Sequence, residues 1–456
     1  GLARHHIREH FRTTRPLNIL VAEDNRLNQR IIVATLDTKG PEVAHLRDRL
    51  LALGVESLVV DSGILGEPVG IVPDVSHAEL AGRGGITLAQ LQASGTRGRA
   101  VEIMRGLVQD LVRERFDAGE LVGGISIGGV GSVMGAAAIQ ELPVGVPKIV
   151  VAPTASGHHE FGPYVGLKDV MVVHSVVDIL GLNPVMTTVL DNVAAAMAGM
   201  LAHGHALAPP EEGRRYVAAT MLGNTTQAVG ALKDELAEHG IETVVFHSNG
   251  VGGPAMEELA AEGQFMGVID YTTNEINDPL VGGIHNGGPD RLRVVGRLGI
   301  PQVLVPGCID FSVWAASSIP ENMADRPVYD HNPEYTLVRA THEEKKLMGR
   351  IFAERVNEST APVHIVMPLR GLSIPATPEG PFWDPEGDQL FLAELRANLR
   401  GGITVEREDG KHEALDVGLH LPLAGAGTWN KARVIIDIVL NIHFRFKKIP
   451  LPLRTG

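Results

Sequence analysis

The stretch LVGGISIGGVGSVMGAAAIQEL, residues 121–142, decides the fold class. Its first seven residues form an apolar run of strand length, glycines follow at Gly128, Gly129 and Gly131, and Ser132 begins an alanine-rich segment of helical length. A buried strand that passes through a glycine turn into a helix is typical of a parallel βαβ unit. The turn lets the backbone approach a ligand closely, and the amides at the helix start favour an anion.

The same alternation of strand and helix extends in both directions along the chain. We expect strands at 31–36, 57–61, 121–127 and 148–153, with helices at 41–53, 103–116 and 132–142. The polar, proline-bearing stretch 203–215 predicts a linker. A second alternation follows, with strands at 216–221, 243–248, 267–272, 301–306 and 363–368 and helices at 227–239 and 255–262.

This pattern predicts an α/β fold: two Rossmann-like parallel-sheet domains in tandem with a cleft between them. The expected domains are 30–202 and 216–416, flanked by an N-terminal extension, 1–29, and an atypical C-terminal tail, 417–456.

Composition excludes several classes of protein. The chain has 456 residues, 44% of them hydrophobic, which suits two or three packed domains. A formal net charge of −14 and 4% aromatic residues disfavour binding to nucleic acid or to an anionic membrane. One cysteine, Cys308, excludes an intrachain disulfide and a thiolate zinc cluster. With no apolar stretch of spanning length expected, the protein is predicted to be cytoplasmic.

Three loops of the first domain carry candidate ligand-binding residues. The first is TLDTKG, expected between strand and helix, where Lys39 and the threonine hydroxyls suit a phosphate and Asp37 suits a metal or a helix cap. The second is the glycine turn, and the third, after the strand at 148–153, contains Ser156 and Gly157. Asp61 ends a strand where dinucleotide folds place a ribose ligand. The candidate residues are Thr35, Asp37, Thr38, Lys39, Gly40, Asp61, Gly128, Gly129, Gly131, Ser132, Ser156 and Gly157.

Plainer interpretations of these loops stay open. TLDTKG lacks the Walker A pattern, so a capped turn is an alternative to a phosphate site. The glycines can equally line a contact between helix and sheet. The adjacent His158 and His159 suggest a metal, although neighbouring histidines on a strand point apart.

The second domain offers candidates for acid and base chemistry. Glu275, Asp278, Asp310 and His331 follow predicted strands, so they belong to the edge where α/β enzymes bind their substrates. Each can equally serve as a cap or a hydrogen-bond partner. Cys308 is expected to be a buried thiol rather than a nucleophile.

Residues 18–30, NILVAEDNRLNQR, resemble the opening of a response-regulator receiver domain, in which an acidic pair holds Mg²⁺. Glu23 and Asp24 would be that pair. No phosphoacceptor aspartate or partner lysine can be placed after it, which makes an extension or a grafted fragment the simpler interpretation.

Several long motifs resemble one known family. TLDTKG, GGVGS, LPVGVPKIVVAPTASG, PYVGLKDVMVVHSVVDILGLN, FHSNGVGGPAMEEL, GGPDRL and YDHNPEYTLVR are similar to motifs in the ATP-binding family of the tomato mosaic virus resistance protein, from about Ile31 to about Glu406. The resemblance implies two α/β subdomains, ATP binding at the first and a homodimer. It places Thr35, Asp37, Lys39, the GGVGS glycines and Ser156–Gly157 in motif loops. The chain departs from the family before residue 29, and at DVGLHLPLAGAGTWNKARV, where family members close with an acidic segment.

Three functions follow as hypotheses. The first is a cytoplasmic ATP-binding protein, with Mg²⁺, that acts on a small metabolite in the interdomain cleft. The second is a non-catalytic module whose nucleotide gates binding of a protein partner. The third is a metabolite enzyme of the same fold that does not use ATP.

Overall fold

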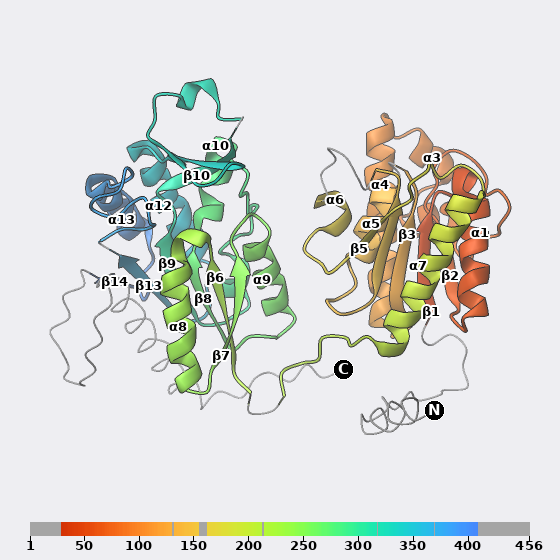
Figure 1. Ribbon diagram of the computed structural model, residues 1–456, viewed down its shortest axis with the longest axis horizontal. Coiled ribbons are helices and arrows are strands. Elements are labelled where there is room, and N and C mark those ends of the chain that lie inside the picture. The colour runs from red at the N-terminus through yellow and green to blue at the C-terminus, as the bar shows by residue number, and fades with distance from the viewer. Residues whose placement is uncertain are drawn as a thin grey trace, which may run out of the picture. The chain divides into compact units, whose positions relative to one another are not determined.

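The chain forms two α/β units, which divide between Leu207 and Ala208, within the stretch expected to be a linker. The computed structural model describes residues 29–129, 132–154, 162–211, 214–316, 318–368 and 370–408. Each unit has its own parallel sheet (Figure 1). Both are Rossmann-like, as the alternation of strands and helices predicts. The structure describes each unit by itself, so the interdomain cleft stays a prediction.

The first unit is a five-stranded parallel sheet with helices on both faces. The strand order is β2-β1-β3-β4-β5. The elements are β1 (Gln29–Ala34), α1 (Leu36–Ala52), β2 (Ser57–Asp61), α2 (His77–Arg83), α3 (Leu88–Gln92), α4 (Arg97–Asp117), β3 (Leu121–Ile127), α5 (Ser132–Ile139), β4 (Lys148–Ala152), α6 (Gly162–Val165), β5 (Met171–His174) and α7 (Pro184–His203). Gln29, expected in the N-terminal extension, is therefore part of β1 together with Arg30, and both belong to the receiver-like fragment.

Alternate residues of β1 enter two separate cores because a strand turns successive side chains to opposite faces. Ile31 and Val33 pack with residues of α4 and α5. Ile32 and Ala34 pack with residues of α1 and α7. Burial on both faces explains why the parallel strands are continuous apolar runs in the sequence.

Helix α7 departs from the expectation that no segment has the length of a membrane span. Among the described residues it is one helix of sufficient length and apolar composition to cross a membrane. In the first unit 28% of this apolar stretch is buried, where Met186, Leu190 and Val193 contribute to the core.

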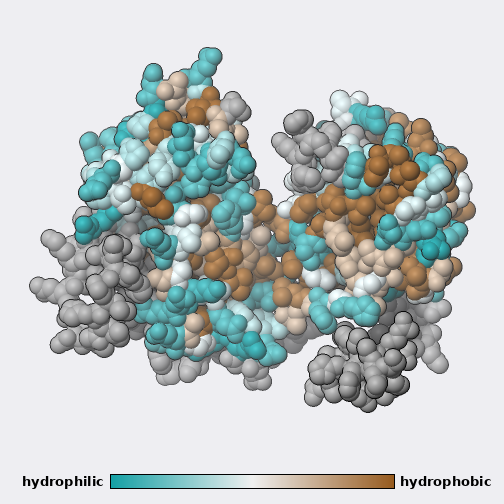
Figure 2. Space-filling model, viewed as in Figure 1, coloured by the Kyte–Doolittle hydropathy of each residue, from teal (hydrophilic) through white to brown (hydrophobic). Residues whose placement is uncertain are grey.

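Apolar side chains are also exposed near β5 and the start of α7. Figure 2 shows hydrophobic residues gathered over this part of the first unit. Val176 is 64% exposed and Leu180 is 76% exposed. The other exposed apolar residues of this segment are Leu167, Met171, Leu182 and Val185. A concentration of this kind is typical of surfaces that contact another protein.

The second unit has a six-stranded parallel sheet, order β14-β13-β9-β8-β6-β7, and a three-stranded antiparallel sheet, order β10-β12-β11. Its elements are β6 (Tyr216–Met221), η1 (Gly223–Thr225), α8 (Thr226–Glu238), β7 (Glu242–His247), α9 (Gly252–Ala261), β8 (Gly267–Thr272), η2 (Asn274–Ile276), α10 (Asp278–Val281), α11 (Val294–Arg297), β9 (Gln302–Gly307), β10 (Phe311–Ala315), η3 (Glu321–Met323), β11 (Val328–Asp330), β12 (Tyr335–Arg339), α12 (His342–Val356), β13 (Val363–Pro368), α13 (Pro385–Asn398) and β14 (Thr404–Glu408).

The antiparallel sheet was not expected from the sequence. Strands β11 and β12 form a hairpin in which Asp330 pairs with Thr336. Asn332 closes its turn, because its Oδ1 accepts the N–H groups of Glu334 and Tyr335 at 2.9 and 2.8 Å. The turn places His331 beyond the carboxyl edge of the parallel sheet, where the pocket described below lies.

Both parallel sheets reverse their strand order next to their first strand. In the first unit β1 lies between β2 and β3, and in the second β6 lies between β7 and β8. The connections to the two neighbours leave on opposite sides, which opens a crevice at the carboxyl edge of such a sheet. These two points position the candidate sites.

Candidate functional site

The predicted loops of the first unit leave one edge of one sheet. Ala34 at the end of β1 is paired with both Asp61 and Ile127, so the loops after β1, β2 and β3 begin side by side. Ile127 is paired in turn with Val151, and the N–H of Gly128 donates to Val151 O at 3.1 Å. The register therefore brings the expected ligand loops together at the point where the strand order reverses.

The loop TLDTKG is not a loop in the structure. Helix α1 begins at Leu36, with Thr35 as its extended N-cap, so Asp37 to Gly40 form the first turns of the helix. The expected start at residue 41 is wrong by more than a turn, because α1 begins at Leu36 and Pro41, a common first residue of helices, is here inside the helix. The helix N-terminus is therefore closer to the sheet edge than the sequence pattern indicated.

The polar side chains of this turn have different surroundings. The Lys39 ammonium donates to the carbonyl oxygen of Ile179, so in this structure it braces the segment before α7. Thr38 is exposed, and its hydroxyl lies 3.3 Å from both Thr35 Oγ1 and Asp37 Oδ1. Asp37 is half-buried at the carboxyl edge of the sheet. Its carboxylate therefore keeps the solvent access that a metal ligand needs.

Asp61 lies inside the unit rather than at its surface. Its side chain is fully buried, and Oδ1 accepts the N–H groups of Leu36 at 3.1 Å and Gly63 at 2.8 Å. Burial raises the pKa of this carboxyl group, and the two N–H groups oppose that shift. Asp61 thus holds the first turn of α1 in place, and the ribose contact expected from its position stays a prediction.

The glycines around β3 serve two purposes. A Cβ at Gly124 would lie 2.6 Å from Ile139, and one at Gly135 would lie 2.5 Å from Ser126 Oγ, so these two permit close packing of α5 on the sheet. A Cβ at Gly129 would meet no atom within 4 Å. Ser132 ties the turn together, because its hydroxyl donates to Gly129 O at 2.6 Å. Packing therefore does not require the glycine at 129, whose space is open to a ligand.

Some expected residues lie outside the part of the chain that the structure describes. These are Gly131, Ser156, Gly157, His158 and His159, together with Glu23 and Asp24 of the receiver-like fragment. Thr154, the last described residue before the third loop, follows β4 at the same edge as Gly128.

In the second unit Glu275 belongs to a buried ion cluster. Arg291 is fully buried, and its Nε donates to Glu275 Oε2 at 2.6 Å. The guanidinium also donates to both carboxylate oxygens of Asp270 and lies 3.4 Å from Glu257. Glu275 Oε1 accepts the N–H of Gly250 at 2.8 Å. Glu275 thus braces a glycine turn, and its side chain does not reach the pocket described below.

Asp278 supports the wall of the pocket from behind. It is fully buried, its Oδ2 accepts the N–H of His285 at 2.7 Å, and its Oδ1 accepts the N–H of Val313 at 3.2 Å. Burial raises its pKa to about 7, against the two N–H groups. Asp278 therefore orients two residues of the pocket without lining it.

Asp310 is fully buried as well. Its Oδ2 accepts the hydroxyl proton of Ser373 at 2.6 Å, and burial raises its pKa to about 7. Neighbouring Cys308 is buried in a left-handed backbone conformation, φ 60°, and burial raises the pKa of its thiol. This confirms the expectation that Cys308 is a buried thiol.

The buried Asp310 predicts a pH-dependent stability. The pKa of Asp310 is about 7 in the folded protein and 3.8 in the unfolded chain, so the folded protein binds the carboxyl proton more tightly. The stability that this protonation contributes is therefore complete at low pH and is lost as pH rises through about 7. Between pH 5.5 and 8 the free energy of unfolding of the wild type should fall by about 2 kcal/mol more than that of Asp310→Asn. Urea unfolding followed by tryptophan fluorescence measures this, because Trp314 and Trp383 belong to the second unit. Equal losses in both proteins would contradict it.

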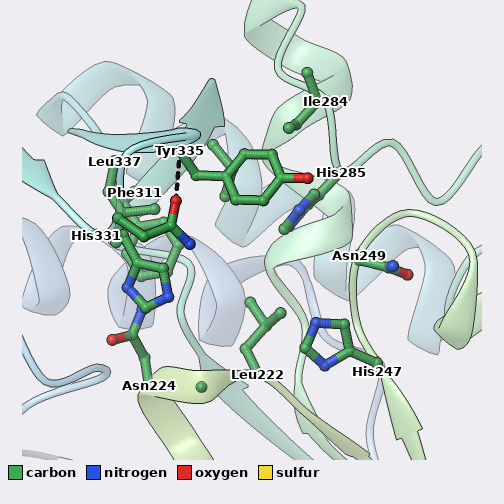
Figure 3. Close-up of a pocket in the computed structure, with 13 residues that line it drawn as sticks. Leu222, Asn224, His247, Asn249, Ile284, His285, Phe311, His331, Tyr335 and Leu337 are labelled. Atoms are coloured by element: carbon green, nitrogen blue, oxygen red, sulfur yellow. Dashed lines mark hydrogen bonds between the residues drawn. The ribbon is translucent and has the colours of Figure 1, made fainter. Parts of the chain in front are cut away.

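A pocket of about 280 Å³ lies at the carboxyl edge of the second sheet. Its residues follow β6, β7 and β8, the three strands at which the order reverses, and the antiparallel sheet supplies the rest. Figure 3 shows Asn224 and His331 on one side, His247 and His285 on the other, and Leu222 between them. The full lining is Leu222, Gly223, Asn224, His247, Asn249, Ile284, His285, Phe311, Val313, His331, Asn332, Tyr335 and Leu337.

Of the four acid or base candidates, His331 is the one that lines this pocket. The other two histidines, His247 and His285, were not predicted from the sequence. Burial, with a smaller effect of His247, lowers the pKa of His285 to about 4, so its ring is neutral at pH 7. The Asn274 amide lies 3.2 Å from its Nδ1. A signal was present, because His247 stands at the end of a predicted strand, as substrate-binding residues of α/β folds do.

The histidines do not form a metal site. Within the described ranges no group of three or more His, Cys, Asp or Glu side chains is arranged to hold a metal ion. The chemistry that the pocket offers to a ligand is therefore hydrogen bonding by imidazoles, carboxamides and a phenol, above an apolar floor.

Comparison with known proteins identifies relatives. Residues 28–206 match the N-terminal domain, and residues 214–414 the C-terminal domain, of the "Uncharacterised protein family (UPF0261)". A UPF0261 protein of Clostridium tetani is 37% identical over 377 residues, which cover 82% of this chain and 92% of the relative. The tomato ToMV resistance protein Tm-1(GCR237) is 36% identical over 309 residues, covering 66% of this chain and 41% of the tomato protein.

Solved structures are more remote. The glycosyltransferase SsfS6 of Streptomyces sp. SF2575, complexed with thymidine diphosphate, is 16% identical, with a TM-score of 0.17 over 61% of this chain and 82% of that chain. The expected kinship with the tomato protein is confirmed by sequence, whereas ATP binding stays a prediction. Because models of both domains match in order and a relative is covered nearly end to end, the chain belongs to the protein family UPF0261.

Proposed function

We propose that the protein binds ATP, together with Mg²⁺, at the carboxyl edge of the first sheet. The observation that supports this most is that the carboxyl ends of β1, β3 and β4 lie side by side where the strand order reverses. Open crevices at such points are where doubly wound sheets bind nucleotides. The N-termini of α1 and α5 lie at this edge and favour phosphate.

The residues present fit such a ligand. Gly129 leaves open space beside the start of α5, where a side chain would obstruct a phosphate. Asp37, half-buried in the first turn of α1, would hold Mg²⁺. Lys39 would contribute its charge from the same turn, although its ammonium is bonded to Ile179 O. When bound, the nucleotide would supply a transferable phosphoryl group.

The titration of ATP with Mg²⁺ tests this proposal by calorimetry. Gly129→Val should weaken binding by at least about tenfold, because the added side chain fills space that the backbone otherwise leaves to a phosphate. Gly106→Val is the matched control, since a Cβ at Gly106 in α4 also meets no atom within 4 Å and lies away from the edge. Absence of binding to the wild type, or equal binding to Gly129→Val, would reject the site.

We propose further that the bound ATP serves a reaction on a small metabolite. ADP release that a metabolite accelerates would support an enzyme. ATP binding without turnover would instead favour a nucleotide-gated module for a protein partner, and displacement of metabolites but no affinity for ATP would favour the enzyme that does not use it.

A homodimer is part of the same proposal. The exposed apolar residues near β5 and α7 support association with another protein surface. Sedimentation equilibrium measures the mass directly, and a monomer at all concentrations would contradict this part.

A further inference from the structure

The pocket of the second unit has a lining suited to a ligand of particular charge. Its polar side chains are three imidazoles, three carboxamides and a phenol: His247, His285, His331, Asn224, Asn249, Asn332 and Tyr335. Among the described residues that line it, none is aspartate or glutamate. In a chain with 54 acidic residues and a net charge of −14, such a lining favours a ligand that is itself an acceptor of hydrogen bonds.

The carboxylate of Asp278, which lies behind the wall of the pocket, is turned away from the cavity. Both oxygens of Asp278 accept backbone N–H groups, those of His285 and Val313. The side chain is fully buried, so it presents no oxygen to the cavity. An anion in the pocket is thereby spared direct contact with a neighbouring carboxylate.

The floor of the pocket is apolar and closed. Phe311 is fully buried, and Leu222, Val313 and Leu337 are 6%, 2% and 3% exposed. Ile284 and Tyr335 at the rim are 43% and 40% exposed, so the opening faces solvent. A ligand of this pocket therefore combines a polar head with a small apolar body.

One end of the pocket is formed by a short turn. Gly223 and Asn224 belong to the three-residue turn η1, which precedes α8 in the chain. The His331 ring lies over this turn, because a Cβ on Gly223 would be 3.6 Å from its Cε1. The His331 imidazole and the Asn224 carboxamide thus lie together at this end of the pocket, where both can donate to a carboxylate.

We propose that this pocket binds a small organic acid. The carboxylate lies toward His331, Asn224 and the start of η1, and the apolar body lies on Leu222, Phe311 and Leu337. This proposal does not rest on nucleotide binding in the first unit. The pocket would hold a metabolite with or without ATP bound to the protein.

Ligand-observed NMR titration of the full-length protein tests this, with benzoate as the probe. Benzamide, its neutral counterpart of the same shape, should bind about tenfold more weakly, because it offers no charge to the donors. Inorganic phosphate, which lacks an apolar body, should also bind more weakly than benzoate.

Two variants locate the binding. His331→Leu should weaken benzoate binding about tenfold by removing a donor to the carboxylate. Gly223→Ala should weaken it several-fold, because the new methyl group takes space beside the His331 ring at ordinary contact distance and so leaves the fold intact. Gly230→Ala, in the following helix α8 and with no atom within 4 Å of the new Cβ, is the control and should leave binding unchanged.

Several results would overturn the proposal. These are no binding of benzoate to the wild type, equal binding of benzamide, tighter binding of phosphate, or unchanged benzoate affinity in both His331→Leu and Gly223→Ala. Loss of ATP binding in Gly129→Val with benzoate binding retained would show that the two ligand sites are independent of each other.

Discussion

Replacing Arg291 by methionine should lower the free energy of unfolding of the second unit by about 3–5 kcal/mol. The guanidinium is fully buried and contacts the carboxylates of Asp270, Glu275 and Glu257. Without it, three buried acidic groups lose their cation, and the desolvation of their charges is no longer compensated. Burial already raises the pKa of Glu257 to about 7, although Arg291 opposes that shift.

Urea unfolding followed by tryptophan fluorescence measures this loss in the second unit. Arg350→Met is the control, because the Arg350–Glu394 pair lies on the surface, with 54% and 28% of its side chains exposed. That variant should unfold at nearly the wild-type urea concentration. If Arg291→Met were as stable as Arg350→Met, Arg291 would not be needed to compensate the buried carboxylates of this unit.

Replacing Gly40 by alanine should destabilise the first unit by about 3 kcal/mol, at the upper end of the cost of overpacking. A Cβ at this position would lie 1.7 Å from the carbonyl oxygen of Val69 and 2.8 Å from its carbonyl carbon. The obstacle is backbone, which cannot rotate away as the end of a side chain can. The segment is also tied to the helix, because Val69 N donates to Leu36 O at 3.0 Å.

Hydrogen exchange of peptides from α1 under increasing urea reports this unit separately from the other. Gly106→Ala provides the opposite control, because a methyl group in the open middle of α4 should stabilise the helix by up to about 1 kcal/mol. Protection of α1 that is unchanged in Gly40→Ala would mean that the segment around Val69 shifts at little cost. Since Gly40 lies at the proposed nucleotide edge, weakened ATP binding should accompany the loss.

Part of the site could be predicted because it depends on neighbours in the sequence. A glycine turn between a strand and a helix is a local pattern, and Gly128 and Ser132 stand where it predicts. The roles of acidic residues could not be predicted in this way. Glu275 and Asp310 follow strands as catalytic residues do, yet their roles depend on Arg291 and Ser373, which lie 16 and 63 residues further along the chain.

The sequence by itself determined the α/β class, the parallel sheets and the bounds of β2, β3, β6, β8 and β13, because strands buried on both faces must be continuous apolar runs. Only the tertiary structure decided which polar groups face a ligand. Burial and pairing depend on contacts between distant segments, so Asp278 became a support, His331 became part of a pocket with His247 and His285, and Lys39 became bonded to Ile179. Local pattern chooses the elements, whereas the packing of those elements assigns each charged side chain to the core or to the site.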